Sequence, residues 1–289
     1  APDNDNSDRT KMTKTVAQAM LAKVYAEKEV QDYDKVIAYA DKVMNTTGVE
    51  LEDSYETLWG YDETAIDCMK RNTKEGILEV HWSGGGNWET WMYGRQLDNW
   101  DYYFTWAKWI TPSRDIINDF DKEGDEVRKN QAIVYYACTW SNYYPASNYP
   151  FMYKLRSSYN NIYWVRLADI ILMKAEAEAY KGNLAESAKL VNQIRKRAKL
   201  KDLTSDKTGS KESMIEAVLH ERRLELAFEG ERWFDLCRNN KVEQYLNGID
   251  SRDSGRIRQV RQFDSNSYLL PIPQTALDQN TNLEQNPGY

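Results

Sequence analysis

The sequence predicts an all-α protein built from helical hairpins, with long irregular aromatic-rich loops between them and little strand. Two observations support the helical part: apolar residues recur at helical spacing in two separate stretches, and each stretch is followed by a turn and a second helical stretch. A third observation supports the loops. Six of the ten tryptophans fall between Trp82 and Trp109, in a region that glycine, proline and asparagine interrupt repeatedly.

The first hairpin is predicted for residues 13–48. Val16, Met20 and Val24 form a row at i, i+4 spacing, which is the pattern of a helix with one buried face. A second apolar row follows a short polar break, and Gly48 stands where glycine commonly ends a helix. Alanines interleave with both rows, so we expect close packing between the two helices.

The second hairpin repeats this pattern after more than 100 residues. Leu167, Ile171 and Ala175 make one row, Lys181-Gly182-Asn183 makes a turn, and a return helix starts at Leu184. Alanine-rich hairpins of this size resemble degenerate tetratricopeptide repeats. Because such hairpins bury their faces by stacking, two distant units are too few, and we expect another element to cover them.

A charged helix follows the second hairpin, from about Glu212 to Leu236, with an interruption at Gly230. Shorter elements are a strand at residues 76–82 and a helix starting at Ser113, whereas Tyr135–Tyr163 is expected to be loop. The predicted organisation is a flexible lead-in at residues 1–12 and one domain at 13–289, divided into 13–48, 49–165, 166–245 and an irregular cap at 246–289.

The charge balance excludes several classes of protein. Lys and Arg total 38 against 45 Asp and Glu, which gives a net charge of −7. An acidic chain is a poor binder of nucleic acid or of anionic lipid headgroups. No stretch approaches the ~20 apolar residues that a membrane helix needs. We therefore expect no direct contact of this chain with a membrane.

The sequence offers little material for a metal or cofactor site, and we expect none. Three cysteines lie far apart without CxxC spacing, and the two histidines are separated by 139 residues. Asp119–Gly124 resembles the start of a calcium loop, but Asn130 stands at the twelfth position, where a glutamate is required. We favour a polar turn before a helix, with Asp125 near the helix N-terminus, and leave calcium open.

The charged helix has two interpretations. Glu221, Glu225 and Glu229 share a face at i, i+4 spacing, and a close carboxylate pair could act as acid and base. Arg222 and Arg232 are interleaved at helical spacing, however, and opposite charges lower carboxylate pKa values. We favour a ladder of salt bridges that holds this helix to the hairpins.

The aromatic cluster around the triple glycine Gly84–Gly86 is the candidate binding site. Aromatic rings stack on the apolar face of a sugar while amides, carboxylates and Arg bond its hydroxyls. Six exposed tryptophans would present ~900–1,500 Å², more than a monomer usually exposes, so most rings are expected in the core. The candidate glycan-binding residues are Trp82, Asn87, Trp88, Trp91, Tyr93, Arg95, Trp100 and Tyr102.

Four segments of the C-terminal half carry a family resemblance: residues 166–177, 191–198, 221–236, and 270–273 with the closing 285–289. In order and spacing they resemble the SusD/RagB family of outer-membrane nutrient-binding lipoproteins. The resemblance covers residues 166–289 firmly and the first hairpin loosely. It implies an α-helical scaffold of tetratricopeptide-like hairpins under a looped ligand face.

The resemblance also implies a function. Family members bind glycans without catalysis on the outer face of the outer membrane, and each caps a SusC-like TonB-dependent transporter. The signal peptide and the lipid-bearing cysteine of the family are not in this chain, so we expect it to be the C-terminal part of a longer protein. The aromatic loop has no family-wide motif, so no individual binding residue is transferred.

Two alternatives remain open from the sequence. The chain is an interaction scaffold that docks the transporter without a glycan site of its own, or it is a helical glycoside hydrolase that uses Glu89, Asp98 or Asp101. Uptake of peptides or other nutrients also fits the family resemblance.

Overall fold

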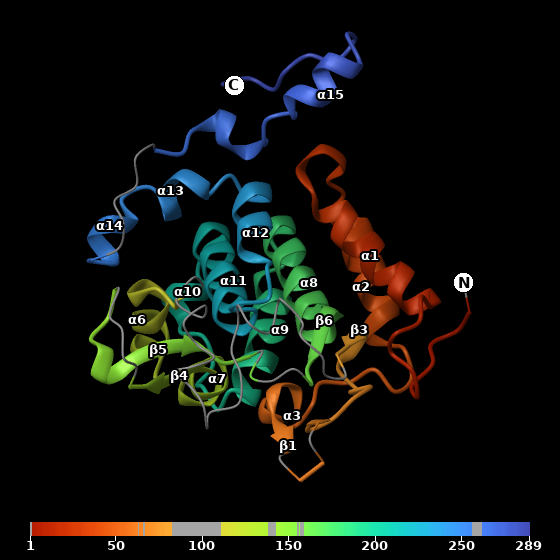
Figure 1. The fold of residues 1–289 in the computed structure, drawn as a ribbon. Coiled ribbons are helices and arrows are strands. Elements are labelled where there is room, and N and C mark those ends of the chain that lie inside the picture. Colours follow the sequence, from red (N-terminus) through yellow and green to blue (C-terminus); the bar gives the residue numbers. More distant parts are fainter. Residues whose placement is uncertain are drawn as a thin grey trace. The chain divides into compact units, whose positions relative to one another are not determined.

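The computed structural model describes residues 2–62, 64–65, 67–82, 111–137, 143–154, 156, 159–255 and 262–289. These residues divide into two compact units, Ala1–Arg232 and Trp233–Tyr289, and each is described by itself. The first unit is predominantly helical, with three two-stranded sheets, so the predicted all-α class is confirmed (Figure 1).

Both predicted hairpins are present. The first consists of α1 (Lys14–Ala26) and α2 (Tyr33–Met44), joined through the short η1 (Lys28–Val30). The second consists of α8 (Leu167–Lys181) and α9 (Leu184–Arg197). Helix α2 packs directly against α8, so the hairpins cover each other, although more than 100 residues separate them (Figure 1). We expected another element to cover the two distant hairpins. This expectation was wrong for the faces of α2 and α8 that pack against each other.

Alanine lets these helices approach closely. The alanines of the seam have no solvent-accessible surface, and they are Ala19, Ala40, Ala168, Ala175 and Ala179. The core around them is completed by aliphatic residues of α9 and α11, among them Val191, Ile194, Val218 and Leu219. Burying each of these larger side chains contributes about 1.5–3 kcal/mol.

The helix ends follow local chemistry. Thr13 and Asp32 cap α1 and α2 by accepting hydrogen bonds from Val16 N and Lys35 N. Gly182 ends α8 with a φ of 85°, a left-handed conformation that residues with a Cβ adopt at a cost.

A small antiparallel sheet lies at the start of the second hairpin. Strand β3 (Gly76–His81), which the sequence predicted, pairs with β6 (Asn161–Arg166), and β6 continues directly into α8. Before β3, α3 (Glu56–Trp59) leads into the short ribbon of β1 (Tyr61–Asp62) and β2 (Asp67–Cys68).

The region between the hairpins holds more regular structure than the sequence suggested. Ser113 caps α6 (Arg114–Glu123), as expected, and Asp125 caps α7 (Glu126–Ala132). Strand β4 (Ile133–Tyr136) then pairs with β5 (Tyr149–Met152), and η4 (Ala146–Asn148) lies between them. The loop predicted for Tyr135–Tyr163 was therefore wrong at three strands, because β-branched and aromatic residues there favour strands despite the adjacent Asn and Pro.

The charged helix is shorter than predicted. After α10 (Ser205–Thr208), α11 spans Lys211–Glu225 and stops. Phe228 and Gly230 take left-handed φ values of 66° and 90°, which reverse the chain before α12 (Arg232–Arg238) begins. The helix predicted from Glu212 to Leu236, with an interruption at Gly230, is two helices: the break falls at Gly230 as predicted, but α11 already ends at Glu225 because the residues around Phe228 and Gly230 form a turn.

The lead-in is anchored to the first hairpin. Arg9 is 2% exposed, and its guanidinium donates to Asn4 Oδ1 at 2.6 Å and to the Gly48 carbonyl at 2.7 Å. The Gly48 position is tightly packed, since an added Cβ would lie 2.1 Å from Asn6 Nδ2. The expected flexibility of residues 1–12 therefore does not extend to Arg9 and its contacts.

The second unit holds most of α12, then α13 (Val242–Leu246), α14 (Ile249–Arg252), η5 (Ser265–Tyr268) and α15 (Gln274–Gln279). Its last residues are tied to an extended segment that precedes α15. Gln285 accepts from Ile272 N at 2.8 Å and donates to Ile272 O at 2.9 Å, and Asn286 donates to Leu270 O at 2.7 Å. These bonds link the two C-terminal segments that carried the family resemblance.

Candidate functional site

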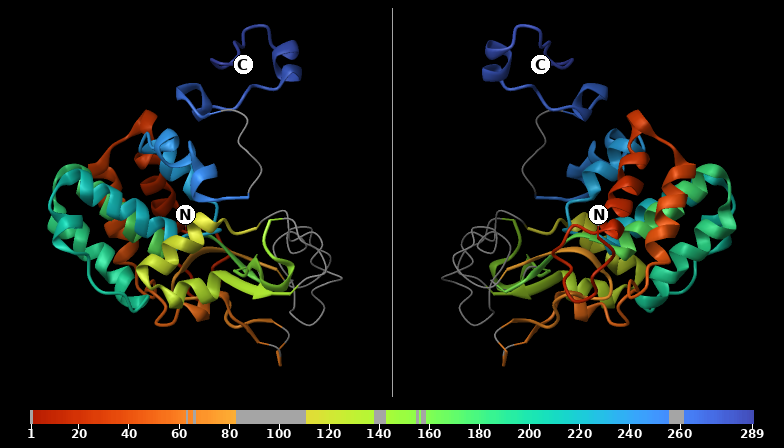
Figure 2. Two further views of the ribbon diagram at one scale, coloured as in Figure 1. Left: turned by 90° about the vertical axis from the view of Figure 1, so that its left-hand side faces the viewer. Right: turned by 90° about the vertical axis from the view of Figure 1, so that its right-hand side faces the viewer.

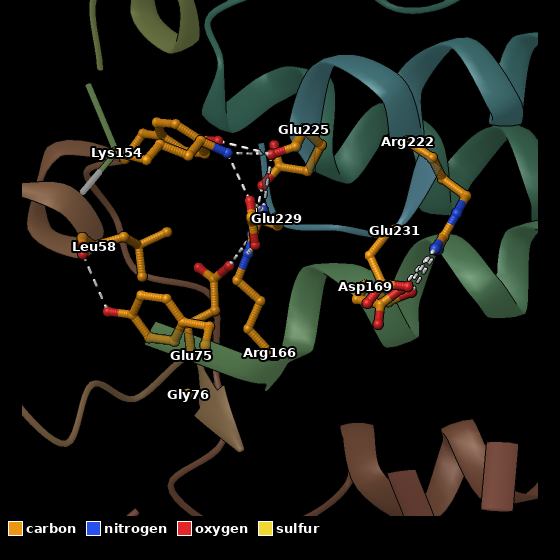
Figure 3. A network of polar contacts seen from close by, with 12 residues as sticks. Leu58, Glu75, Gly76, Lys154, Arg166, Asp169, Arg222, Glu225, Glu229 and Glu231 are labelled. Carbon is orange, nitrogen blue, oxygen red and sulfur yellow. Dashed lines mark hydrogen bonds and ion pairs between the residues drawn. The ribbon is translucent and has the colours of Figure 1, made fainter. Parts of the chain in front are cut away.

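The carboxylates of α11 lie in a buried network of charges, which Figure 3 shows in part. At its centre, the Arg166 guanidinium contacts Glu75 Oε1 at 2.7 Å, Glu225 Oε1 at 2.6 Å and Glu229 Oε2 at 2.7 Å. Arg197 pairs with Glu75 and Glu225 as well. The network thereby joins β3, the start of α8, the end of α9 and the end of α11.

A second part of the network runs along α11 toward α6 and α7. Arg128 is fully buried and contacts Asp125, Glu221 Oε1 at 2.7 Å and Glu225 Oε2 at 3.2 Å. Arg195 bridges Glu221 and Glu123 at 3.0 Å each. These contacts tie the loop region to the helical stack.

A separate cluster holds α1 to the stack. Lys23 Nζ lies 2.7 Å from Asp169 Oδ2 and 2.8 Å from Glu231 Oε1, and Arg222 contacts Asp169 at 2.8 Å. Glu231 reaches this cluster, and Glu229 the other, because the turn at Phe228 and Gly230 directs the two side chains apart (Figure 3).

This geometry favours a structural role for these carboxylates. Burial alone would raise the pKa of Glu225, but Arg197, Arg166 and Arg128 hold it well below its usual range. A carboxylate that stays ionised between three guanidiniums is a poor proton donor. The predicted salt-bridge ladder is therefore present, and its partners lie on other elements: Arg222 pairs with Asp169, and Arg223 pairs with Asp115 and Asp119.

Lys154 is the network's link to the segment after β5. Its ammonium group is fully buried, contacts Glu229 Oε1 at 2.6 Å and donates to the Glu225 carbonyl at 3.1 Å. It also lies over the ring of Trp59 at 4.6 Å. Burial lowers the pKa of Lys154 to about 8, although Glu229 opposes that change.

Of the predicted glycan-binding residues, Trp82 is described by the structure. Its backbone N donates to Asn160 O at 2.9 Å and its carbonyl accepts from Arg71 Nη2 at 2.6 Å. Its indole Nε1 is buried without a hydrogen-bond partner in the described part of the chain. The other predicted glycan-binding residues lie outside the described residues: Asn87, Trp88, Trp91, Tyr93, Arg95, Trp100 and Tyr102. The carboxylates of the hydrolase alternative, Glu89, Asp98 and Asp101, also lie outside them.

The structure adds a group of aromatic residues that the sequence analysis did not single out. We call the described residues between 133 and 153 the tyrosine hairpin: β4, β5, the residues before β5 and the residue after it carry Tyr135, Tyr136, Tyr143, Tyr144, Tyr149 and Tyr153. Rings of Tyr143, Tyr144, Tyr149 and Phe151 follow one another at centroid distances of 4.7, 5.7 and 5.2 Å. At the end of β4, Tyr135 and Tyr136 are 37% and 39% exposed, so their rings are accessible to a ligand.

The predicted aromatic loop starts and ends on described structure. It follows Trp82 at the end of β3, and it rejoins the described chain at Thr111, whose Oγ1 lies 3.0 Å from the hydroxyl of Tyr149. Thr111, the first described residue after the predicted loop, therefore contacts the tyrosine hairpin. A signal was available in the sequence, since Ile133-Val134-Tyr135-Tyr136 has strong β-propensity and precedes a turn-rich stretch.

Two guanidinium groups stack on tyrosines of this hairpin. Arg114 lies 4.4 Å from the ring centre of Tyr143 and 4.1 Å from that of Tyr144. Arg156 lies 3.7 Å from the ring centre of Tyr153. Together with the exposed rings of β4, these groups can bond sugar hydroxyls beside apolar stacking surfaces.

The acidic residues in and after the calcium-like stretch Asp119–Gly124 pair with basic side chains. Asp119 pairs with Arg223, Asp121 with Lys129, and Asp125 caps α7 and contacts Arg128. Over the described residues, no group of three His, Cys, Asp or Glu side chains is arranged to hold a metal ion. A membrane-spanning helix is likewise absent from that part of the chain.

Comparison with known proteins places the chain. Its sequence matches the SusD family over residues 74–289. The chain belongs to the SusD family. A SusD-like protein P2 of Formosa agariphila is 26% identical over 328 residues, which cover all of this chain and 62% of the relative. SusD-like protein P38 of the same organism is 36% identical over 135 residues, which cover 45% of this chain. The chain thus spans less than two thirds of the length of these curated relatives.

Solved structures of the SusD family share the fold. A SusD-like protein of Bacteroides fragilis matches with a TM-score of 0.75 at 20% identity, over 100% of this chain and 68% of that one. The surface glycan-binding protein A of Bacteroides thetaiotaomicron, solved in complex with laminarihexaose, matches with a TM-score of 0.68 at 16% identity, over 98% of this chain and 66% of that one.

Proposed function

We propose that this protein binds glycans without catalysis and that the tyrosine hairpin contributes to the binding face. The observation that supports the proposal most directly is the pair of exposed rings, Tyr135 and Tyr136, on a hairpin that also carries the guanidinium of Arg156 stacked on Tyr153. Rings of this kind stack on sugar faces at little cost in rotamer entropy. The laminarihexaose complex of a structural relative of the same family supports a glycan as the ligand.

The cellular role that we propose follows from family membership. The protein acts at the outer face of the outer membrane and delivers its glycan to a SusC-like TonB-dependent transporter. Absence of catalysis is supported by the ion-paired state of Glu75, Glu225 and Glu229, which leaves no acid–base pair in the buried network. Glu89, Asp98 and Asp101 stay as candidates for the hydrolase alternative.

Affinity electrophoresis against a polysaccharide panel tests the proposal. We expect retardation of the native chain by at least one glycan and loss of that retardation in the double variant Tyr135→Ala/Tyr136→Ala. A matched control is Trp164→Ala, which removes an exposed ring, 62% accessible, from β6. Binding that is lost in Trp164→Ala but kept in the double variant would place the site on the β3–β6 sheet instead.

The interaction-scaffold alternative gives a different result. The chain would be retarded by no glycan but would copurify with the transporter. Release of reducing sugar from a retarded glycan, abolished by changing one carboxylate, would support the hydrolase alternative and contradict the proposal.

A further inference from the structure

Arg156 is a buried cation beside the tyrosine hairpin. It is 8% exposed, and its guanidinium stacks on the ring of Tyr153. Its Nε donates to the Tyr153 carbonyl at 3.0 Å, and its Nη2 donates to Gln131 O and Gln131 Oε1 at 3.0 Å each. All of these acceptors are uncharged, so they fix the orientation of the side chain without forming an ion pair with it.

The other buried arginines of the first unit show how unusual this is. Arg128, Arg166, Arg195, Arg197 and Arg222 each contact at least one carboxylate within 4 Å. Arg156 has no such contact in the part of the chain that the structure describes. The carboxylate that acts on it through space belongs to the exposed Glu56, and burial lowers the pKa of Arg156 to about 10, which keeps it charged at neutral pH.

Arg9 is also buried without an ion pair, but its two terminal nitrogens are both used by Asn4 and Gly48. Nη1 of Arg156, by contrast, has no hydrogen bond within the described residues and is not among the nitrogens sealed from solvent. Isolated charges are costly to bury, because a solvated ion loses several kcal/mol of hydration. A free, oriented donor on such a cation fits an anionic ligand.

We propose that Arg156 binds an acidic substituent, a carboxylate or a sulfate ester, of a glycan that lies along β4. The inference rests on the proposed function and specifies its substrate class. Tyr153, on whose ring the guanidinium stacks, follows by three residues Pro150, the β5 partner of the exposed Tyr135, which is about 10 Å along a strand. A short oligosaccharide therefore reaches both the stacking ring and the cation.

Long-range electrostatics would disfavour an acidic glycan, because the chain carries a net charge of −7. Recognition of an acidic glycan must then come from short-range contacts at a local cation. One charge-assisted hydrogen bond in a partly desolvated site changes binding by about tenfold or more.

The experiment uses acidic glycans and their neutralised counterparts. The panel contains polygalacturonate and its carboxyl-reduced form, chondroitin sulfate and its desulfated form, and laminarin as an unrelated neutral polymer. We expect the native chain to bind an acidic polymer at least tenfold more tightly than its matched neutralised form. Loss of preference on carboxyl reduction identifies a carboxylate, and loss on desulfation identifies a sulfate ester.

Variants then assign the preference to Arg156. Arg156→Gln should weaken binding of the acidic polymer about tenfold and leave binding of the neutralised form unchanged, and Arg156→Lys should fall between. Lys189→Gln removes the same charge from an exposed side chain of α9, 75% accessible, and should change neither. An unchanged thermal midpoint in each variant excludes unfolding as the cause.

Two results overturn the inference, and they differ in what else they contradict. Binding of laminarin or of a neutralised polymer as tight as binding of the acidic forms rejects the acidic class but keeps the proposed function. Binding to no polymer rejects the proposed function as well. Equal losses in Arg156→Gln and Lys189→Gln would attribute the preference to net charge and not to Arg156.

Discussion

Arg166 and Arg156 are two buried arginines, 1% and 8% exposed, in opposite electrostatic surroundings. Arg166 is held by the carboxylates of Glu75, Glu225 and Glu229, whereas Arg156 is held by uncharged acceptors and the ring of Tyr153. The first arrangement consumes every strong interaction that the guanidinium offers. The second arrangement leaves one terminal nitrogen of the Arg156 guanidinium without a hydrogen bond among the described residues. The two regions therefore differ in whether a buried arginine is paired with carboxylates: it is in the scaffold, and it is not at the candidate ligand face.

The largest expected effect comes from removing Arg166, whose charge is compensated by carboxylates. Arg166→Met leaves Glu75 dependent on Arg197 alone and takes one of three guanidiniums from Glu225, and removing one partner of a buried ion pair costs about 3–5 kcal/mol. Denaturation by urea, monitored by tryptophan fluorescence, measures this loss. Lys181→Met is the matched control, because its pair with the exposed Asp34 should contribute less than about 1 kcal/mol. Equal losses in both variants would contradict the contrast.

Acid should weaken the buried network around Arg166. The pKa of Glu225 is lowered in the folded protein, so its contribution is present above the unfolded value near ~4.3 and is lost as pH falls below it. A buried, salt-bridged carboxylate of this kind contributes about 2–3 kcal/mol. The free energy of unfolding, measured between about pH 5 and pH 3, should fall less steeply in Glu225→Gln. A parallel decline in both proteins would assign acid sensitivity to other groups.

Alkaline conditions should act on Lys154 in the opposite sense. Its folded pKa of about 8 lies below the unfolded value of roughly 10.4, so the unfolded chain binds more protons between these values. Stability from this group should therefore rise by about 2 kcal/mol between pH 8 and about pH 9.5. Lys154→Met should lack the rise. An identical pH profile for native protein and variant would mean that the ammonium group titrates normally.

The smallest expected effect on stability concerns Arg156, which has no ion pair among the described residues. Arg156→Gln loses three hydrogen bonds but relieves a buried charge that forms no ion pair among the described residues, so stability should change by about 1 kcal/mol or less. The urea midpoint measures the change. A loss as large as that of Arg166→Met would make Arg156 part of the scaffold and remove the basis for a ligand role.

The sequence predicted the scaffold better than the candidate site. Rows such as Val16–Met20–Val24 and Leu167–Ile171–Ala175 depend on local periodicity, and caps at Thr13, Ser113 and Asp125 depend on neighbouring residues, so both are visible without a fold. The packing of α2 on α8 was not predictable in this way, because it is a contact between distant segments.

The partners of charged residues were also beyond the sequence. Helical spacing suggested that Arg222 would pair with Glu225, but the fold gives it Asp169, which lies 53 residues earlier in the chain. Gly230 was recognised as an interruption, yet its left-handed φ and the resulting separation of Glu229 from Glu231 need three-dimensional context. Arg156 had no sequence signal, since what distinguishes it is that no carboxylate of the described residues lies within ion-pair distance of its guanidinium.

The direct packing of α2 against α8 has a consequence for how this protein can diversify. Everything between Met44 and Leu167 is an insertion whose two ends are fixed by one helix–helix interface. Closing a longer loop costs only about 0.6 kcal/mol for each doubling of its length. Evolution can therefore lengthen or shorten those parts of the insertion that carry the candidate ligand face, provided that Glu75, Arg128 and Lys154 stay in place to pair with the buried charges of the helical stack.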